Sequence, residues 1–336
     1  MSTRLLELHR HLEGSIRLST ILEIAETYEV ESIPLELEAL RRRIEVRGSL
    51  GSLSAFLERL ELCRSVYLNL DVCHRVAKEC VEDAAKENIG YMELRFSPSF
   101  MATPHGLDME DVIDAVSTGV KSAERETSIR VGLIGILDRS HGPDPARAEL
   151  AAILNRESAF VGIDLAGDEA KWPPSFFVDH FDRVRSTTRL GITVHAGEAL
   201  GSESVRVAVE KLGAIRVGHA VRAIEDPRLI DTLVERGVGI EVCLTSNLHT
   251  GAVSSYDCHP VAKYLAAGLR VSLGTDDPTV SAINLRHELG TAAMLARLST
   301  EQVARTQEDS LRMAFLSNSD REIVRAALTM ETKADP

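Results

Sequence analysis

Short apolar runs rich in β-branched residues recur along this chain, and longer amphipathic stretches separate them. Several runs are almost continuous in apolar residues, which is typical of parallel strands that are buried on both faces. The pattern predicts eight strands, at Leu5–His9, Tyr91–Ser97, Val131–Leu137, Val161–Ala166, Gly191–His195, Arg216–His219, Gly239–Leu244 and Arg270–Gly274. Eight such strands with helices between them indicate the α/β class and a (β/α)8 TIM barrel.

Helical periodicity, with apolar residues three and four positions apart, fills the intervals between these strands. It predicts helices over Ser15–Tyr28, Ser52–Tyr67, Asp71–Glu87, Met109–Arg125, Pro174–Thr187, Glu203–Lys211, Pro227–Arg236 and His259–Ala267. The interval between the first two strands is long, and we expect its extra helices to cover the carboxyl ends of the strands. Because no linker or change in composition divides the chain, we expect residues 1–336 to form one domain.

The composition excludes several classes of protein. The formal net charge of −13, from 38 basic and 51 acidic residues, argues against nucleic acid or an anionic membrane as a partner. The five cysteines are scattered and form no Cys-x-x-Cys, so we expect free thiols and a reducing, cytoplasmic setting. We expect neither a signal peptide before the first strand nor a membrane span.

The first strand leads into two histidines, His9 and His11. Residues two apart in a strand share a face, so both imidazoles should point to the same side. His195 and Asp276 also lie at strand ends, and barrels of this class place their chemistry at the carboxyl ends of the strands. Three imidazoles and one carboxylate suit zinc, although iron or cobalt is possible. The strand Val161–Ala166 has no Lys or Glu to bridge two metals, which favours a single ion.

Other polar residues at strand ends are candidates for proton transfer. Glu198, three residues after His195, could be a proton shuttle, or it could stabilise the start of the next helix. His219 could orient the attacking water, deprotonate it or stabilise its charge, and the alternative is a structural histidine. The neighbouring carboxylates of Asp276 and Asp277 should repel each other unless a metal holds the first and a hydrogen-bond donor the second. Gly167 could let a flat ligand approach the backbone, or it could simply form a turn.

Together these motifs resemble the adenosine deaminase family, a mononuclear zinc branch of the metal-dependent amidohydrolase barrels. The matching motifs cover nearly the whole chain in family order, as Leu-His-Arg-His-Leu-Glu-Gly-Ser, Glu-Leu-Arg-Phe-Ser-Pro, Asp-Leu-Ala-Gly-Asp-Glu, His-Ala-Gly-Glu, Val-Gly-His, Cys-Leu-Thr-Ser-Asn and Thr-Asp-Asp-Pro. Each motif alone is weak, but the ordered set is highly specific.

The resemblance implies a hydrolase that converts adenosine or 2′-deoxyadenosine to the inosine product and ammonia. It implies one Zn²⁺ per chain, held by His9, His11, His195 and Asp276. Glu198 would protonate the purine N1, and His219 with the zinc would activate and orient the hydroxide that attacks C6.

The resemblance also implies contacts with a small-molecule purine nucleoside. Asp277 would hydrogen-bond N7, the Gly167 backbone would contact N3, and His11 and Glu13 would line the substrate site. The helix Ser52–Tyr67 would cover the pocket.

Glu13 departs from the family pattern, since members that act on adenosine often carry Asp at this position, where it meets the ribose. The longer side chain leaves the 5′ side of the substrate open. A 5′-modified adenosine, such as 6-aminodeoxyfutalosine of menaquinone synthesis, is therefore the alternative substrate. The Asp-Leu-Ala-Gly-Asp-Glu motif resembles members that use nucleosides rather than free adenine.

Two other functions are alternatives to nucleoside deamination. One is a different hydrolysis on the same barrel, such as the opening of an amide ring, against which the implied purine contacts argue. The other is an inactive relative that binds nucleosides or acts as a scaffold, although no candidate ligand or acid is missing. The second known design of nucleobase deaminase is excluded, because the chain has no Pro-Cys-x-x-Cys.

Overall fold

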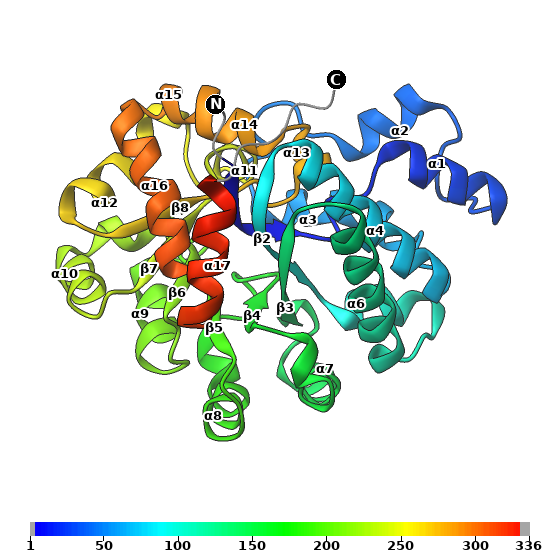
Figure 1. Ribbon diagram of the computed structural model, residues 1–336, viewed down its shortest axis with the longest axis horizontal. Helices are drawn as coiled ribbons and strands as arrows, with labels where there is room; N and C mark the ends of the chain where they lie inside the picture. Colours follow the sequence, from blue (N-terminus) through cyan, green and yellow to red (C-terminus); the bar gives the residue numbers. More distant parts are fainter. Residues whose placement is uncertain (1–3, 330–336) are drawn as a thin grey trace.

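Eight parallel strands pair in chain order around one barrel in the computed structural model, which describes residues 4–329 (Figure 1). The strands are β1 (Leu5–His11), β2 (Ile89–Phe96), β3 (Arg130–Asp138), β4 (Gly162–Ala166), β5 (Gly191–Ala196), β6 (Arg216–His219), β7 (Gly239–Val242) and β8 (Arg270–Leu273). This confirms the predicted (β/α)8 barrel.

The barrel closes between β1 and the chain that follows β8. Asp276 N donates to His9 O at 2.9 Å, and His11 N donates to Asp276 O at 2.8 Å. This closure extends β1 to His11, two residues beyond the predicted end, and places both histidines beside Asp276.

The outer helices bury one apolar stripe each against the strands. In α4, buried side chains recur at Val72, Val76 and Cys80, and Asn69 caps the helix by accepting a hydrogen bond from Val72 N. The ring around the strands consists of α4 (Leu70–Lys86), α6 (Met109–Glu126), α7 (Pro143–Asn155), α8 (Val178–Thr187), α9 (Ser202–Glu210), α10 (Pro227–Glu235), α12 (Val261–Ala267) and α16 (Thr300–Met313).

Further helices lie in the connections. They are α1 (Leu18–Thr27), α2 (Leu37–Ile44), α3 (Leu53–Arg64), α5 (Pro98–Ala102), α11 (Leu244–His249), α13 (Pro278–Ser281), α14 (Leu285–His287), α15 (Ala293–Leu295) and α17 (Asn318–Thr329). One π-helical turn spans Glu288–Ala292, and 3₁₀ turns lie at Thr103–His105, Arg139–His141, Glu157–Ala159, Pro174–Phe177, Val221–Glu225 and Tyr256–Cys258. Within residues 4–329 no helix combines the length and apolar character needed to cross a membrane.

The predicted end of β7 is wrong. The strand stops at Val242, and Leu244 already begins α11. The buried Glu288 carboxylate accepts hydrogen bonds from Leu244 N at 3.0 Å and Thr245 N at 3.2 Å, which satisfies the free amides at the start of this helix. A partner more than forty residues away cannot be recognised from the local pattern.

Candidate active site

A pocket opens at the carboxyl ends of the strands. Helix α3 forms one wall with Leu53, Phe56, Leu57 and Leu60, as expected for a helix that covers the site. The polar lining includes every predicted site residue except the buried His9: His11, Glu13, Gly167, His195, Glu198, His219, Asp276 and Asp277. The fold thus brings together residues from β1, β5, β6 and the segments that follow β4 and β8.

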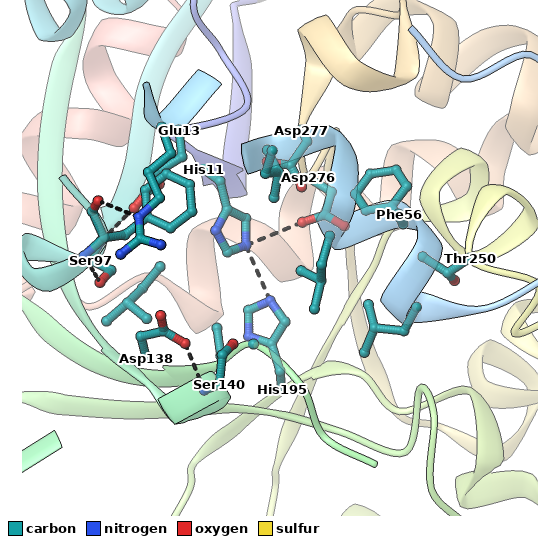
Figure 2. Close-up of a pocket in the computed structure, with 18 of the residues that line it drawn as sticks. His11, Glu13, Phe56, Ser97, Asp138, Ser140, His195, Thr250, Asp276 and Asp277 are labelled. Atoms are coloured by element: carbon teal, nitrogen blue, oxygen red, sulfur yellow. Dashed lines mark hydrogen bonds and ion pairs between the residues drawn. The ribbon is translucent and has the colours of Figure 1, made fainter. Parts of the chain in front are cut away.

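Four of the predicted site residues converge on one point: His9, His11, His195 and Asp276. Figure 2 shows His11, His195 and Asp276 pointing toward one another. His9 Nε2 and His11 Nε2 each lie 3.2 Å from Asp276 Oδ1, and His11 Nε2 lies 3.2 Å from His195 Nε2. All four ligand atoms lie within 4.8 Å of one another.

The donor atoms suit a metal ion. His9 Nε2 is buried and forms no hydrogen bond within residues 4–329, and an unsatisfied buried nitrogen is costly unless a cation or donor meets it. Three imidazole nitrogens, which are borderline ligands, with one carboxylate oxygen match a ligand set that zinc accepts. Cys243 offers a second grouping with His219 and Asp276, but burial raises the pKa of its thiol well above the usual value, which disfavours the thiolate ligand.

A buried charge network orients the histidines from below. Glu241 Oε2 accepts from His9 Nδ1 at 2.7 Å, and Asp164 Oδ2 lies 3.0 Å from His195 Nδ1. Arg95 donates to both carboxylates at 2.7 Å. Such partners fix the ring orientation and leave the Nε2 lone pair for a metal. Glu241 was not predicted as a site residue and no role was predicted for Asp164, because their function depends on contacts between strands.

Backbone conformation marks the same site. His219 and Asp276 both have φ of 63°, in the left-handed region that side chains other than glycine rarely adopt. Such strain persists where the surrounding structure requires a particular side-chain direction, and it concentrates at functional sites.

The Glu198 carboxylate points into the pocket and not toward the start of α9. Its Oε1 accepts from Thr250 Oγ1 at 3.0 Å, and its Oε2 lies 3.6 Å from His219 Nε2. Glu169 instead binds the backbone of this turn, accepting from Gly197 N at 2.6 Å and Ala199 N at 2.7 Å. Burial raises the pKa of Glu198, which favours the protonated form that an acid needs.

Asp277 sits beside the ligand cluster without a hydrogen-bond donor. Its Oδ1 is buried and unpaired among the residues that the structure describes. Burial, followed by the charge of Asp276, raises the pKa of Asp277 well above its usual value. A side chain on Gly14 would collide with Asp277, since a Cβ there would lie 1.9 Å from Oδ1. Glycine at position 14 therefore leaves room for the Asp277 carboxyl, whose unpaired oxygen is available to a ligand.

Gly167 has the conformation that a close backbone approach requires. Its φ is 106°, and an added Cβ would lie 2.5 Å from Ser140 Oγ and 2.7 Å from Asp138 Oδ1. Only glycine fits here, and its backbone lines the pocket.

Glu13, Ser97 and Asp138 form the other end of the pocket, on the far side of His11 from Thr250 (Figure 2). Glu13 Oε1 accepts from Ser97 N at 2.5 Å, whereas its buried Oε2 has no partner in the described part of the chain. Burial raises the pKa of Glu13 to about 8. Asp138 was not predicted, although a carboxylate at the end of β3 is the signal that identified the other candidates.

Comparison with known proteins gives a consistent result. The family model described as adenosine deaminase matches residues 5–330. The adenosine deaminase of Edwardsiella ictaluri is 46% identical over 326 residues, covering 97% of this chain and 98% of that protein. The adenosine deaminase of Aliivibrio fischeri is 44% identical and covers 96% of each chain.

Solved structures agree with this result. An adenine deaminase from Arthrobacter aurescens has a TM-score of 0.90 at 25% identity and 98% coverage of both chains. An amidohydrolase from Burkhoderia ambifaria with bound Zn has a TM-score of 0.86 at 25% identity, covering 97% of this chain and 89% of its own. Arabidopsis ADAL in complex with IMP has a TM-score of 0.84 at 26% identity, covering 97% and 96%. This chain belongs to the adenosine deaminase family and is a hydrolytic deaminase.

Proposed function

We propose that this chain catalyses the zinc-dependent deamination of adenosine or 2′-deoxyadenosine to inosine or 2′-deoxyinosine and ammonia. One observation carries the proposal. A buried carboxyl with a raised pKa, Glu198, lines the same pocket as the convergent metal-ligand atoms of His11, His195 and Asp276. An acid beside a source of hydroxide is what the replacement of a ring amino group by oxygen requires.

His9, His11, His195 and Asp276 would hold one zinc ion. Such an ion supplies hydroxide at neutral pH by lowering the pKa of water. Metal analysis of the purified protein should give one zinc per chain. Removal by a chelator should abolish turnover, and added zinc should restore it. Full activity in metal-free protein would contradict this assignment.

The chain's own residues supply the remaining steps. The Glu198 carboxyl gives its proton to purine N1, which makes C6 electrophilic. Asp277, whose Oδ1 is unpaired within residues 4–329, binds the N7 edge as hydrogen-bond donor, and the Gly167 backbone contacts N3. Water adds at C6 as hydroxide. Its two protons pass to the leaving amino nitrogen and back to the Glu198 carboxylate as the C6–N bond breaks, the C6=O bond forms and ammonia is released.

The end of the pocket formed by Glu13, Ser97 and Asp138, here called the sugar end, supports a nucleoside substrate over free adenine. Glu13 Oε2, which is buried and unpaired within the described chain, has no role unless a ligand group reaches it. A ribose hydroxyl would meet this need, and so would some 5′-modified sugars. 6-Aminodeoxyfutalosine is therefore kept as the alternative substrate.

The decisive assay compares kcat/KM for adenosine, 2′-deoxyadenosine, 5′-methylthioadenosine, 6-aminodeoxyfutalosine and adenine, because this ratio measures discrimination in the transition state. We expect the two unmodified nucleosides to be preferred. A higher value for aminodeoxyfutalosine would replace the proposed substrate and leave the deamination unchanged.

A further inference from the structure

Two residues without an assigned role, Asn247 and His259, lie behind the pocket. Asn247 is buried in α11, and His259 is buried just before α12. Asn247 Nδ2 lies 3.0 Å from His219 Nδ1, and Asn247 Oδ1 lies 3.1 Å from His259 Nε2. The three side chains thus form one continuous line of hydrogen bonds that ends at His219.

A backbone amide fixes the direction in which each hydrogen bond of this line is donated. Val261 N can only donate, and it lies 3.1 Å from His259 Nδ1. His259 Nδ1 must therefore carry the lone pair, so its proton is on Nε2 and points to Asn247. Burial also lowers the pKa of His259 to about 3, which keeps the ring neutral.

The proton on His259 Nε2 also determines the orientation of the Asn247 side-chain amide. Since His259 Nε2 donates, the atom that faces it must be the amide oxygen, and the amide nitrogen must face His219. The reversed amide would place two donors together at His259 and an oxygen 3.5 Å from Glu198 Oε1. In the observed orientation the two amide hydrogens reach His219 Nδ1 and the Glu198 carboxyl.

We infer that Asn247 and His259 act as a positioning relay that keeps the proton of His219 on Nε2, so that His219 donates a hydrogen bond to the attacking oxygen and does not act as its base. His219 Nε2 faces the reaction space, 3.6 Å from Glu198 Oε2 and 3.9 Å from Asp276 Oδ2. With Nδ1 accepting from Asn247, a neutral His219 has no lone pair left on the pocket side. Of the three roles open to this histidine, orientation and charge stabilisation remain, and removal of the proton is excluded.

The catalytic part of this inference rests on the proposed deamination, whereas the position of the proton does not. The first test is therefore a spectrum of the zinc-loaded protein labelled with ¹⁵N-histidine, with His219 assigned by its loss in His219→Gln. Two-bond correlations should show His219 Nε2 protonated and Nδ1 unprotonated. A proton on Nδ1 would overturn the relay even if the enzyme deaminates adenosine, and an inactive enzyme with the proton on Nε2 would overturn only the proposed function.

The second test changes the relay at constant shape. Asn247→Asp presents an acceptor oxygen to His219 Nδ1, which should draw a proton to that nitrogen. We expect kcat to fall about 100-fold, in the range seen when one transition-state donor is lost, with KM changed less than about 3-fold. An Asn247→Asp enzyme with wild-type kcat and the proton still on Nε2 would contradict the inference.

Matched variants separate the relay from general damage. His259→Gln keeps both an amide donor and an acceptor, so it should retain more activity than His259→Leu. Thr250→Val removes the other donor to Glu198 and should leave the ¹⁵N signals of His219 unchanged. His180, on α8, is buried outside the pocket and forms a hydrogen bond with Pro143 O at the start of α7. His180→Gln should therefore leave kcat unchanged. Equal losses in both His259 variants would show that only packing matters there.

Discussion

Buried carboxyls in the barrel interior below the ligand cluster and those in and around the pocket above it have pKa values shifted in opposite directions. Below, Asp164 and Glu241 are paired with Arg95, and Glu241 also meets Arg216 at 2.6 Å. Burial alone would raise the pKa of both carboxyls. The hydrogen bond from His195 and the charge of Arg95 outweigh burial at Asp164, and the charges of Arg95 and Arg216 outweigh it at Glu241. Both pKa values therefore lie well below the usual range.

Above, the carboxyls have no such partners. Over residues 4–329, no Lys or Arg forms an ion pair with Glu13, Glu149, Glu198 or Asp277. Burial raises the pKa of each of them, to about 7 at Glu149. The paired groups are ionised and orient the histidines, whereas the unpaired groups can carry protons. Of the unpaired groups, Glu13, Glu198 and Asp277 line the pocket and can bind uncharged ligand groups, and Glu149 is hydrogen-bonded to Ser97, Ser99 and Asp138. The contrast indicates which carboxyls build the site and which act on the substrate.

The largest expected effect is at an unpaired carboxyl. Glu198→Gln keeps the shape of the side chain but removes the proton that it transfers, so kcat should fall about 1000-fold, within the range for general acid catalysis. Metal content should stay at the wild-type level. Steady-state kinetics combined with metal analysis would measure both. Native turnover in the variant would show that this unpaired carboxyl does not act on the substrate.

The paired region should respond through stability and metal affinity. Arg95→Met leaves Asp164 and Glu241 buried without their shared cation, which should cost about 3–5 kcal/mol of the free energy of unfolding. Disturbing the groups that orient His9 and His195 should also weaken metal binding about 10- to 100-fold.

Denaturant titration and competition with a metal indicator would measure both effects. Arg156→Met, which removes an exposed ion pair with Glu110 and Asp114, is the matched control and should change stability far less. Equal losses in the two variants would mean that the buried pairing has no special role.

Glu149 should make stability depend on pH. It accepts from Ser97 Oγ, Ser99 N and Asp138 N, and burial followed by the charge of Asp138 raises its pKa from 4.5 to about 7. A raised carboxyl pKa means that the folded state binds the proton more tightly than the unfolded state. Its contribution is complete below pH 4.5 and is lost as the pH rises through 7, amounting to about 3 kcal/mol over that window.

Glu149→Gln should remove this contribution and so make the free energy of unfolding depend less on pH. The pH dependence is measured, and not the stability at one pH, because the amide also loses one acceptor. Denaturant titrations between pH 4.5 and 8 would measure it, with Glu235→Gln as an exposed control on α10. An unchanged slope in Glu149→Gln would show that this carboxyl ionises normally despite its burial.

The smallest effect concerns the sugar end. Asp138 presents a carboxylate at this end of the pocket and forms no ion pair with Lys or Arg in the described chain, so it should repel a 5′-phosphate. Asp138→Asn should raise the ratio of kcat/KM for AMP over adenosine about 10-fold, which corresponds to about 1.4 kcal/mol. Thr250→Asn, at the opposite end of the pocket, is the control and should leave this ratio unchanged. An unchanged ratio in Asp138→Asn would exclude charge at this position as a selector.

Much of the fold follows from local patterns. Apolar runs and helical stripes predict the barrel because a parallel strand or an amphipathic helix carries its burial in its own residues. The boundaries at His11 and Val242 do not follow, since closure by Asp276 and capping by Glu288 bring in partners from distant segments. No range was predicted for α2, α5, α7, α11 or the helices from α13 to α17.

The order of residues along the chain predicts which side chains meet, because His9, His11, His195, Glu198 and Asp276 lie at or near strand ends and the barrel topology brings all strand ends together. The protonation of each group depends on contacts that form only in the folded protein. Whether a buried carboxyl is ionised depends on whether an arginine from another strand reaches it, as at Glu241 but not at Glu13. Electrostatic energy in a buried site is set by distances between atoms far apart in the chain, and no local pattern encodes those distances.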